Sequence, residues 1–225
     1  MKITNASMLI SMDLMMDKYN QLIIENAIDF RTLVGELIEL ERGMVTETVI
    51  MDGYEFVKFK DNIELIVNPL FINPNSTKIL KKLYNNLACI VTADDLQLQY
   101  MELNGMCNEL LSSLDNDSEI NFTWNDMLEL PQLFKVAGLK VDVGNSDVLI
   151  ENLVDYINVS NSIMGTKLFI FINLIDYLSS DELLTFMQTA RYLNVCILDV
   201  QSNEKYDRMG CENNYIIDKD RCVIT

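Results

Sequence analysis

The most constraining feature of this chain is a short apolar segment, LFIFIN, at residues 168–173. Aromatic and β-branched residues in an unbroken run are typical of a strand that is buried on both faces. Ser179 and Glu182 then have the spacing of a capping box, which predicts that a helix begins there. A second apolar segment, VCILDV, follows at 195–200. Because two parallel strands need a crossover connection, this strand–helix–strand order predicts a parallel α/β sheet.

Acidic side chains accompany both strands, with Asp176 in the turn after the first and Asp199 near the end of the second. In nucleotide-hydrolysing α/β proteins, an aspartate at such a strand end holds magnesium. That chemistry also requires a phosphate-binding loop of the form G-x-x-x-x-G-K-[ST]. None of the eight glycines is followed by Lys-Ser or Lys-Thr. We therefore expect an ordinary turn after the strand and no nucleotide hydrolysis.

Histidine is absent from the chain. This absence excludes the commonest general base and every Ser-His or Cys-His dyad. Catalysis would have to depend on carboxylates, lysine or a metal ion. We expect a protein that is not an enzyme, and the alternative left open is a metal-dependent phosphohydrolase that uses Asp176 and Asp199.

The bulk composition is that of a globular protein from a reducing compartment. Of the 225 residues, 49% are hydrophobic and 23% are charged, which is ordinary for a globular chain. The five cysteines include no C-x-x-C pair, as expected of reduced thiols. No apolar run is long enough for a bilayer, and acids occur too early in the N-terminal segment for a secretory signal. We expect a cytoplasmic protein without membrane contact.

The first 70 residues are predicted to form a small, mostly antiparallel sheet with one helix. The segment LIIEN at 22–26 has strand character, and residues 27–42 have the pattern of an amphipathic helix that ends at Gly43. Asp52-Gly53 lies between β-branched and aromatic residues, which is a strong hairpin signal.

The middle of the chain is predicted to be a helical insertion. Helical spacing runs through 75–114 with an interruption at Gly105, and a short strand candidate at 120–124 precedes a helix at 125–137. LKVDV at 139–143 then returns to strand character. The fold class is therefore α/β, with the chain divided into a discontinuous α/β domain, 1–73 and 138–225, and a helical insertion, 74–137.

The formal net charge of −17 argues, as an average, against nucleic acid. The charge is nevertheless unevenly distributed. Lys78, Lys81 and Lys82 are spaced to share one helix face, whereas the segment from Asp94 to Glu129 holds nine acids and neither Lys nor Arg. The lysine face is either a set of phosphate contacts or a solvated helix surface.

The acidic segment contains a pattern that partly resembles a calcium loop. In DNDSEINFTWND, residues 115–126, three acids alternate as in the first half of such a loop. Ile120 stands where an EF-hand needs glycine, and the closing acid is Asp rather than Glu. The sequence thus argues against an EF-hand but favours a simpler oxygen-ligand site, with a solvated acidic loop as the alternative. The candidate ligands are Asp115, Asp117, Glu119 and Asp126.

Several segments, taken in order, resemble one protein family. INPNSTKILKKLYNNL, LPQLFKVAGLKVDV, the run from KLFIFIN to VCILDV and the ending YIIDKDRCVIT are similar to the type II-A CRISPR-associated adaptation protein, the ring-forming protein required for spacer acquisition in antiviral defence. LIIENAIDFRTLVGELIELERG resembles the first strand and helix of that family. The likeness covers nearly the whole chain, which would be a short, divergent member.

The resemblance implies a head domain like the sheet of a P-loop NTPase that has lost its phosphate loop, with an inserted helical leg. It also implies a homotetrameric ring that binds Ca²⁺ and double-stranded DNA ends, without catalysis, through a lysine-lined hole. The implied protein partners are other CRISPR adaptation proteins and the effector nuclease of the same system.

The resemblance carries over to individual residues unevenly. It implies calcium ligation by Asp117, Glu119 and Asp126, and because the alignment needs one inserted residue there, Asp115 is an equal candidate. The lysines in matching segments are Lys78, Lys81, Lys82, Lys135 and Lys140, and the sequence leaves open which of them face DNA. A scaffold that binds only proteins of the same system remains a further alternative to the DNA-binding ring.

Overall fold

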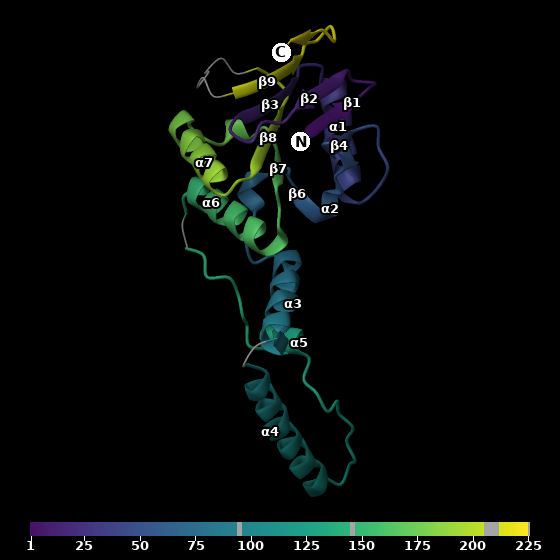
Figure 1. The fold of residues 1–225 in the computed structure, drawn as a ribbon, viewed down its shortest axis with the longest axis vertical. Helices are drawn as coiled ribbons and strands as arrows, with labels where there is room; N and C mark the ends of the chain where they lie inside the picture. The colour runs from purple at the N-terminus through teal and green to yellow at the C-terminus, as the bar shows by residue number, and fades with distance from the viewer. Residues whose placement is uncertain (94–95, 145–146, 205–211, 225) are drawn as a thin grey trace. The chain divides into compact units, whose positions relative to one another are not determined.

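The computed structural model describes residues 1–93, 96–144, 147–204 and 212–224. The chain forms two compact units: unit 1 is Met1–Pro74 with Val143–Thr225, and unit 2 is Asn75–Asp142 (Figure 1). The insertion expected from the sequence was 74–137, so unit 2 is one residue later at its start and five residues longer at its end.

The main sheet of unit 1 has six strands in the order β10-β9-β3-β8-β7-β6. The strands from β9 to β6 are parallel to their neighbours, and β10 is antiparallel to β9. The bounds are β3 (Tyr19–Ile24), β6 (Ile63–Ile66), β7 (Leu168–Ile172), β8 (Cys196–Gln201), β9 (Glu212–Ile217) and β10 (Val223–Ile224). This sheet confirms the α/β class and the parallel crossover predicted from residues 168–200.

The helix between β7 and β8 begins where the capping box predicts. In α7 (Ser180–Tyr192), the Ser179 hydroxyl accepts from the Glu182 amide, and the Glu182 carboxylate accepts from the Ser179 amide at 2.8 Å. Phe186 of α7 lies edge-on to Phe171 of β7, with ring centroids 5.7 Å apart. The preceding helix α6 (Leu149–Val159) runs into one π-helical turn, Ser160–Met164. The capping box predicted from the sequence and the packing of α7 against β7 therefore both support this strand–helix–strand crossover.

A second, antiparallel sheet of four strands has the order β2-β1-β4-β5. Its strands are β1 (Lys2–Asn5), β2 (Ile10–Asp13), β4 (Val49–Asp52) and β5 (Glu55–Phe56), and the last two form the predicted Asp52-Gly53 hairpin. The prediction of a mostly antiparallel N-terminal sheet is wrong for β3 and β6, which join the parallel sheet. All six β3 residues are buried, and a strand that is buried throughout belongs in the middle of a covered sheet.

The core of unit 1 lies between the two sheets and α1 (Ala27–Glu41). Leu33 and Leu37 of α1 are fully buried and pack in one cluster with apolar residues of both sheets. Short helices connect these elements: α2 (Phe59–Asn62), a 3₁₀ turn at Pro69–Phe71 and a second 3₁₀ turn at Leu174–Asp176.

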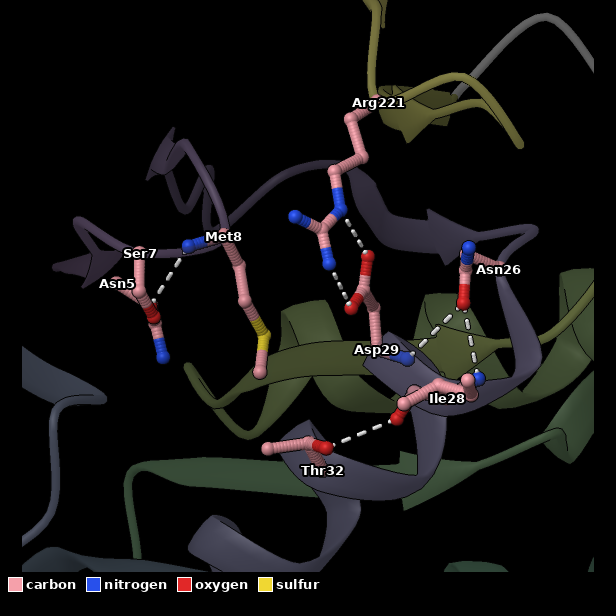
Figure 2. Close-up of polar contacts among 8 residues, drawn as sticks. All are labelled: Asn5, Ser7, Met8, Asn26, Ile28, Asp29, Thr32 and Arg221. Atoms are coloured by element: carbon pink, nitrogen blue, oxygen red, sulfur yellow. Dashed lines mark hydrogen bonds and ion pairs between the residues drawn. The ribbon is translucent and has the colours of Figure 1, made fainter.

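Polar side chains tie the turns of unit 1 to α1 (Figure 2). The fully buried Asn5 accepts from the amide of Met8 at 3.0 Å and donates to the carboxylate of Glu36 on α1 at 3.0 Å. Arg221, in the C-terminal hairpin, makes two 2.9 Å hydrogen bonds with the Asp29 carboxylate (Figure 2). These contacts fix the N- and C-terminal segments of unit 1 against the same helix.

Unit 2 contains α3 (Thr77–Ala93), α4 (Leu96–Asp117) and α5 (Leu130–Val136). Gly105 lies inside α4 and does not interrupt it, so that prediction is wrong. Residues 94–95, between α3 and α4, lie outside the described part of the chain. α5 begins five residues later than predicted, with Pro131 in its first turn, where a missing amide hydrogen is tolerated.

The strands predicted at 120–124 and 139–143 do not form. The segment 118–129, here called the strap, is instead held along α4 by side chains. The Leu128 amide donates to Asn104 Oδ1 at 2.7 Å, Asn108 donates to the carbonyl of Asp126 at 2.8 Å, and the Phe122 amide donates to Asp115 Oδ1 at 2.7 Å. Because side chains of α4 take up these backbone groups, the strap needs no neighbouring strand.

Across the described ranges, none of the helices is both long enough and apolar enough to cross a bilayer.

Candidate nucleic-acid interface

Three of the five candidate lysines lie in the first two turns of α3. Lys78, Lys81 and Lys82 are all exposed, and their spacing places them on adjoining positions of one helix surface. A helix N-terminus already carries partial positive charge, so cations are disfavoured there. Residues 75–93 also contain no acid. This end of α3 is therefore a concentrated positive surface in a chain whose net charge is −17.

A pocket of about 360 Å³ lies between α3 and α5, and it brings two candidate lysines together. Lys81 comes from α3 and Lys135 from α5, 54 residues apart in sequence. The remaining lining is contributed by Thr77, Leu80, Tyr84, Asn85, Pro131 and Gln132. Sequence reasoning named the two lysines as separate candidates and missed the pocket. The available signal was the spacing of Thr77, Lys81, Tyr84 and Asn85 along one helix face.

The segment that carries Lys140 is anchored to the start of α3. Asn75 accepts from the Val141 amide at 2.8 Å and donates to the Val141 carbonyl at 3.1 Å. The Tyr84 hydroxyl donates to the Leu139 carbonyl at 2.8 Å. Lys140 is exposed between these two fixed residues. The structure therefore attaches the fifth lysine to the same helical end, although Lys140 does not line the pocket.

The four candidate calcium ligands do not form a metal site within one chain. Asp115 and Asp117 lie inside α4, so residues two apart point to different sides of the helix instead of alternating along a loop. Asp115 is also occupied by the Phe122 amide at 2.7 Å, and Glu119 and Asp126 follow in the strap. Across the described residues, there is no group of three or more acidic or cysteine side chains placed to hold a metal ion. Calcium ligation by these four acids, which the resemblance implies, therefore stays a prediction.

The turn after β3 in unit 1 lacks the features of a phosphate-binding loop. The connection to α1 is Glu25-Asn26, without glycine. Asn26 Oδ1 accepts from the amides of Ile28 at 3.0 Å and Asp29 at 3.3 Å (Figure 2), and the Asn26 carbonyl accepts from Phe30 at 2.9 Å. Since helix N-termini bind anions through free amides, this capped end with an adjacent carboxylate excludes one.

Asp199 is likewise committed to the fold. It lies within β8 rather than at its end, and it is fully buried. Its carboxylate accepts from the Tyr19 hydroxyl at 2.6 Å, the amides of Leu174 and Ile175 at 2.8 and 3.3 Å, and Gln201 Nε2 at 2.8 Å.

Burial raises the pKa of Asp199, and these four donors oppose the rise. Burial, followed by the nearby Asp199 carboxylate, raises the pKa of Tyr19. This network holds the turn after β7 in place, and it occupies the Asp199 oxygens that a metal ion would otherwise use. Asp176, in contrast, is exposed.

The protein thus combines a parallel α/β unit that lacks a phosphate-binding loop with a helical unit that has a basic end. The profile of the CRISPR-associated protein family Cas_Csn2 matches residues 46–221, and the chain belongs to that family, the type II-A adaptation proteins. It is a divergent member. CRISPR-associated protein Csn2 of Streptococcus agalactiae is 25% identical over 163 residues, which cover 71% of this chain and 70% of that protein.

A second relative and one solved structure are also similar to this chain. CRISPR-associated protein Csn2 of Enterococcus faecalis is 25% identical over 156 residues, which cover 69% of this chain and 68% of that protein. The crystal structure of Stu0660 of Streptococcus thermophilus covers 97% of this chain and 74% of its own, with a TM-score of 0.60 and 14% identity. At that identity, the structural likeness shows a shared fold.

Proposed function

We propose that this protein binds the ends of double-stranded DNA, without catalysis, during spacer acquisition in type II-A CRISPR immunity. The observation that carries the proposal is the gathering of lysines at one end of unit 2. α3 and α5 contribute Lys81 and Lys135 to one pocket, and Lys78, Lys82 and Lys140 lie on the same elements or directly after them. Lysine contacts with phosphates are independent of base sequence, as a protein that handles DNA of any sequence requires.

The acidity of the rest of the molecule supports this reading. α4 and the strap carry acids without a single lysine or arginine, and this half of unit 2 repels a DNA backbone. Within unit 2, attraction is thus confined to the α3–α5 end. Like-charge repulsion elsewhere suppresses binding in other orientations.

Absence of catalysis is the second part of the proposal. At the N-terminus of α1 the amides of Ile28 and Asp29 are taken up by Asn26, and Asp199 is buried among four donors. A phosphohydrolase would need an accessible carboxylate at the strand end together with a bound metal. The alternative that uses Asp176 and Asp199 is therefore disfavoured.

We infer that copies of this chain associate through α4, in line with the homotetramer expected from the sequence. The side of α4 that faces the strap is polar, with Asn104 buried, while its outward side is apolar. Such an exposed apolar surface is typical of an interaction site. The seven-residue spacing of Leu96, Leu103 and Leu110, with Met106 between them, matches the seam of paired helices. On this side the exposed apolar side chains are Leu96, Leu103, Met106, Leu110 and Leu114, each 37–70% exposed, whereas Leu98 and Met101 are exposed elsewhere around the helix.

Association with other adaptation proteins and with the effector nuclease stays part of the proposal. So does calcium dependence, although the described residues of one chain include no group of three or more acidic or cysteine side chains placed to hold the ion.

The test is a mobility shift of linear and closed-circular duplex DNA of equal length, with and without calcium. We expect the linear form to shift and the closed circle to remain free, because only the linear form has ends. Phosphate release from a nucleotide that disappears in Asp176→Ala would favour the hydrolase instead. If neither DNA form shifts at any calcium concentration, the protein is a scaffold for other proteins and the proposal is wrong.

A further inference from the structure

The pocket between α3 and α5 has more structure than a phosphate contact needs. A lysine on a flat helix surface is sufficient to neutralise a backbone phosphate. Here two lysines from different helices instead line a cavity of about 360 Å³, within the range of pockets that hold small ligands. This arrangement points to a ligand that is held in an open pocket between two helices rather than on a flat surface.

The electrostatics of the pocket select an anion. Lys81 and Lys135 are both exposed at its lining, and none of the described residues that line it carries a carboxylate. An ammonium group is a compact point charge that pairs well with phosphate oxygens. The ligand therefore carries negative charge on the side that meets the lysines.

The apolar side chains that line the pocket suit a flat, apolar part of a ligand. Leu80 and Pro131 contribute aliphatic surface, and Tyr84 contributes an aromatic ring. The Tyr84 ring is held in place because its hydroxyl donates to the Leu139 carbonyl at 2.8 Å and because the ring of Phe134 packs against it at a tilt, with centroids 6.2 Å apart. Fixed aromatic rings are the surfaces on which nucleic-acid bases stack.

The polar side chains of the pocket suit the edge of a base. Asn85 and Gln132 each carry one amide acceptor and two amide donors. Side-chain amides of this kind form paired hydrogen bonds with base edges, most readily with adenine. Thr77 adds a hydroxyl that can donate to or accept from a sugar or a phosphate.

We propose that the α3–α5 pocket binds a single nucleotide, with its phosphate at Lys81 and Lys135 and its base on the floor formed by Leu80, Tyr84 and Pro131. The same chemistry is present in a free nucleotide and in the unpaired terminal nucleotide of a DNA strand. The second source rests on the proposed DNA function, whereas the first does not.

The direct experiment is calorimetric titration of the full-length protein with dAMP. We expect saturable binding, and we expect deoxyadenosine, which lacks the phosphate, to bind about tenfold or more weakly. Lys81→Gln and Lys135→Gln should each weaken dAMP binding by about tenfold. Lys219→Gln, which removes the same charge from an exposed position in unit 1, is the control and should bind dAMP as the unaltered protein does. No saturable binding, or equal weakening in all three variants, would overturn the proposal.

A competition experiment identifies the source of the nucleotide. Linear duplex DNA with a one-nucleotide overhang is bound first, and dAMP is then added. Displacement of the duplex assigns the pocket to the terminal nucleotide of DNA, whereas binding of dAMP without displacement assigns it to a free nucleotide. If the duplex binds but dAMP does not, the pocket proposal fails and the DNA function stands. If dAMP binds but the duplex does not, the pocket proposal stands and the proposed DNA function fails.

Discussion

Asp199 in unit 1 and Lys81 in unit 2 show how differently the two units use charge. The Asp199 carboxylate is fully buried and accepts four hydrogen bonds from its own unit. Lys81 is exposed and lines a pocket with a second lysine and no carboxylate. The Asp199 carboxyl group is thus satisfied by donors of its own unit, whereas the charge of Lys81 is, in the proposed function, available to a ligand.

The same contrast extends to neighbouring groups. In unit 1, Asp29 pairs with Arg221, and Asn26 takes up the first amides of α1 (Figure 2). In unit 2, positive charge is concentrated at the N-terminal end of α3, where the helix itself disfavours it. Groups satisfied by their own fold stabilise it, whereas charge placed where it is locally unfavourable favours a binding role. In the proposed function, unit 1 is therefore the scaffold and unit 2 carries the interaction.

The largest expected effect concerns the internal role of Asp199. In Asp199→Ala, the Tyr19 hydroxyl, two backbone amides and the Gln201 amide lose their acceptor, and an unpaired buried group costs about 1–3 kcal/mol. We expect the free energy of unfolding to fall by about 3 kcal/mol or more, measured by urea denaturation. Asp220→Ala, at an exposed position of unit 1, is the control and should change that value by less than about 0.5 kcal/mol. An Asp199→Ala variant with an unchanged free energy of unfolding would contradict the structural role given to the Asp199 network.

A smaller effect would sharpen the comparison within unit 2. Asn104 is buried and joins α4 to the strap through the Leu128 amide. We expect Asn104→Ala to cost about 1–2 kcal/mol and to accelerate proteolysis between residues 118 and 129. Asn121→Ala, at an exposed position of the strap, should leave the cleavage rate unchanged. Equal cleavage rates in the two variants would mean that the strap is not held by α4.

The smallest effect concerns calcium. Because nine acids between Asp94 and Glu129 have no basic residue among them, a divalent cation should reduce their repulsion. We expect chelation to lower the melting temperature or to shift the oligomer in sedimentation, with magnesium as the control for unspecific screening. Identical melting and sedimentation in calcium and in chelator would remove Asp115, Asp117, Glu119 and Asp126 as ligands.

Local sequence signals predicted unit 1 better than unit 2. The LFIFIN strand and the Ser179 capping box depend on burial and on contacts between near neighbours, and both are present as expected. The sheet assignment of β3 and β6 failed because their partners, β8 and β7, lie more than 100 residues away. Propensity alone carries no information about such pairing.

In unit 2, the errors arise where side chains replace regular pairing. INFTW has strand propensity, but α4 supplies the hydrogen bonds that a neighbouring strand would otherwise supply. Asp115 and Asp117 alternate in sequence, but the continuation of α4 to Asp117 separates them. The pocket at Lys81 and Lys135 depends on the packing of α5 against α3, which no local pattern specifies.

The central claim, that the lysines of unit 2 bind phosphates, is tested most directly by the salt dependence of duplex DNA binding. The comparison is between Lys78→Glu/Lys81→Glu/Lys82→Glu and a control that reverses three exposed lysines of unit 1, Lys58, Lys167 and Lys219. We expect the control to keep the slope of log affinity against log salt. The α3 variant should flatten that slope by about 0.9 for each phosphate contact removed. Equal slopes in the two variants would show that the α3 lysines are only a solvated surface and would contradict the account.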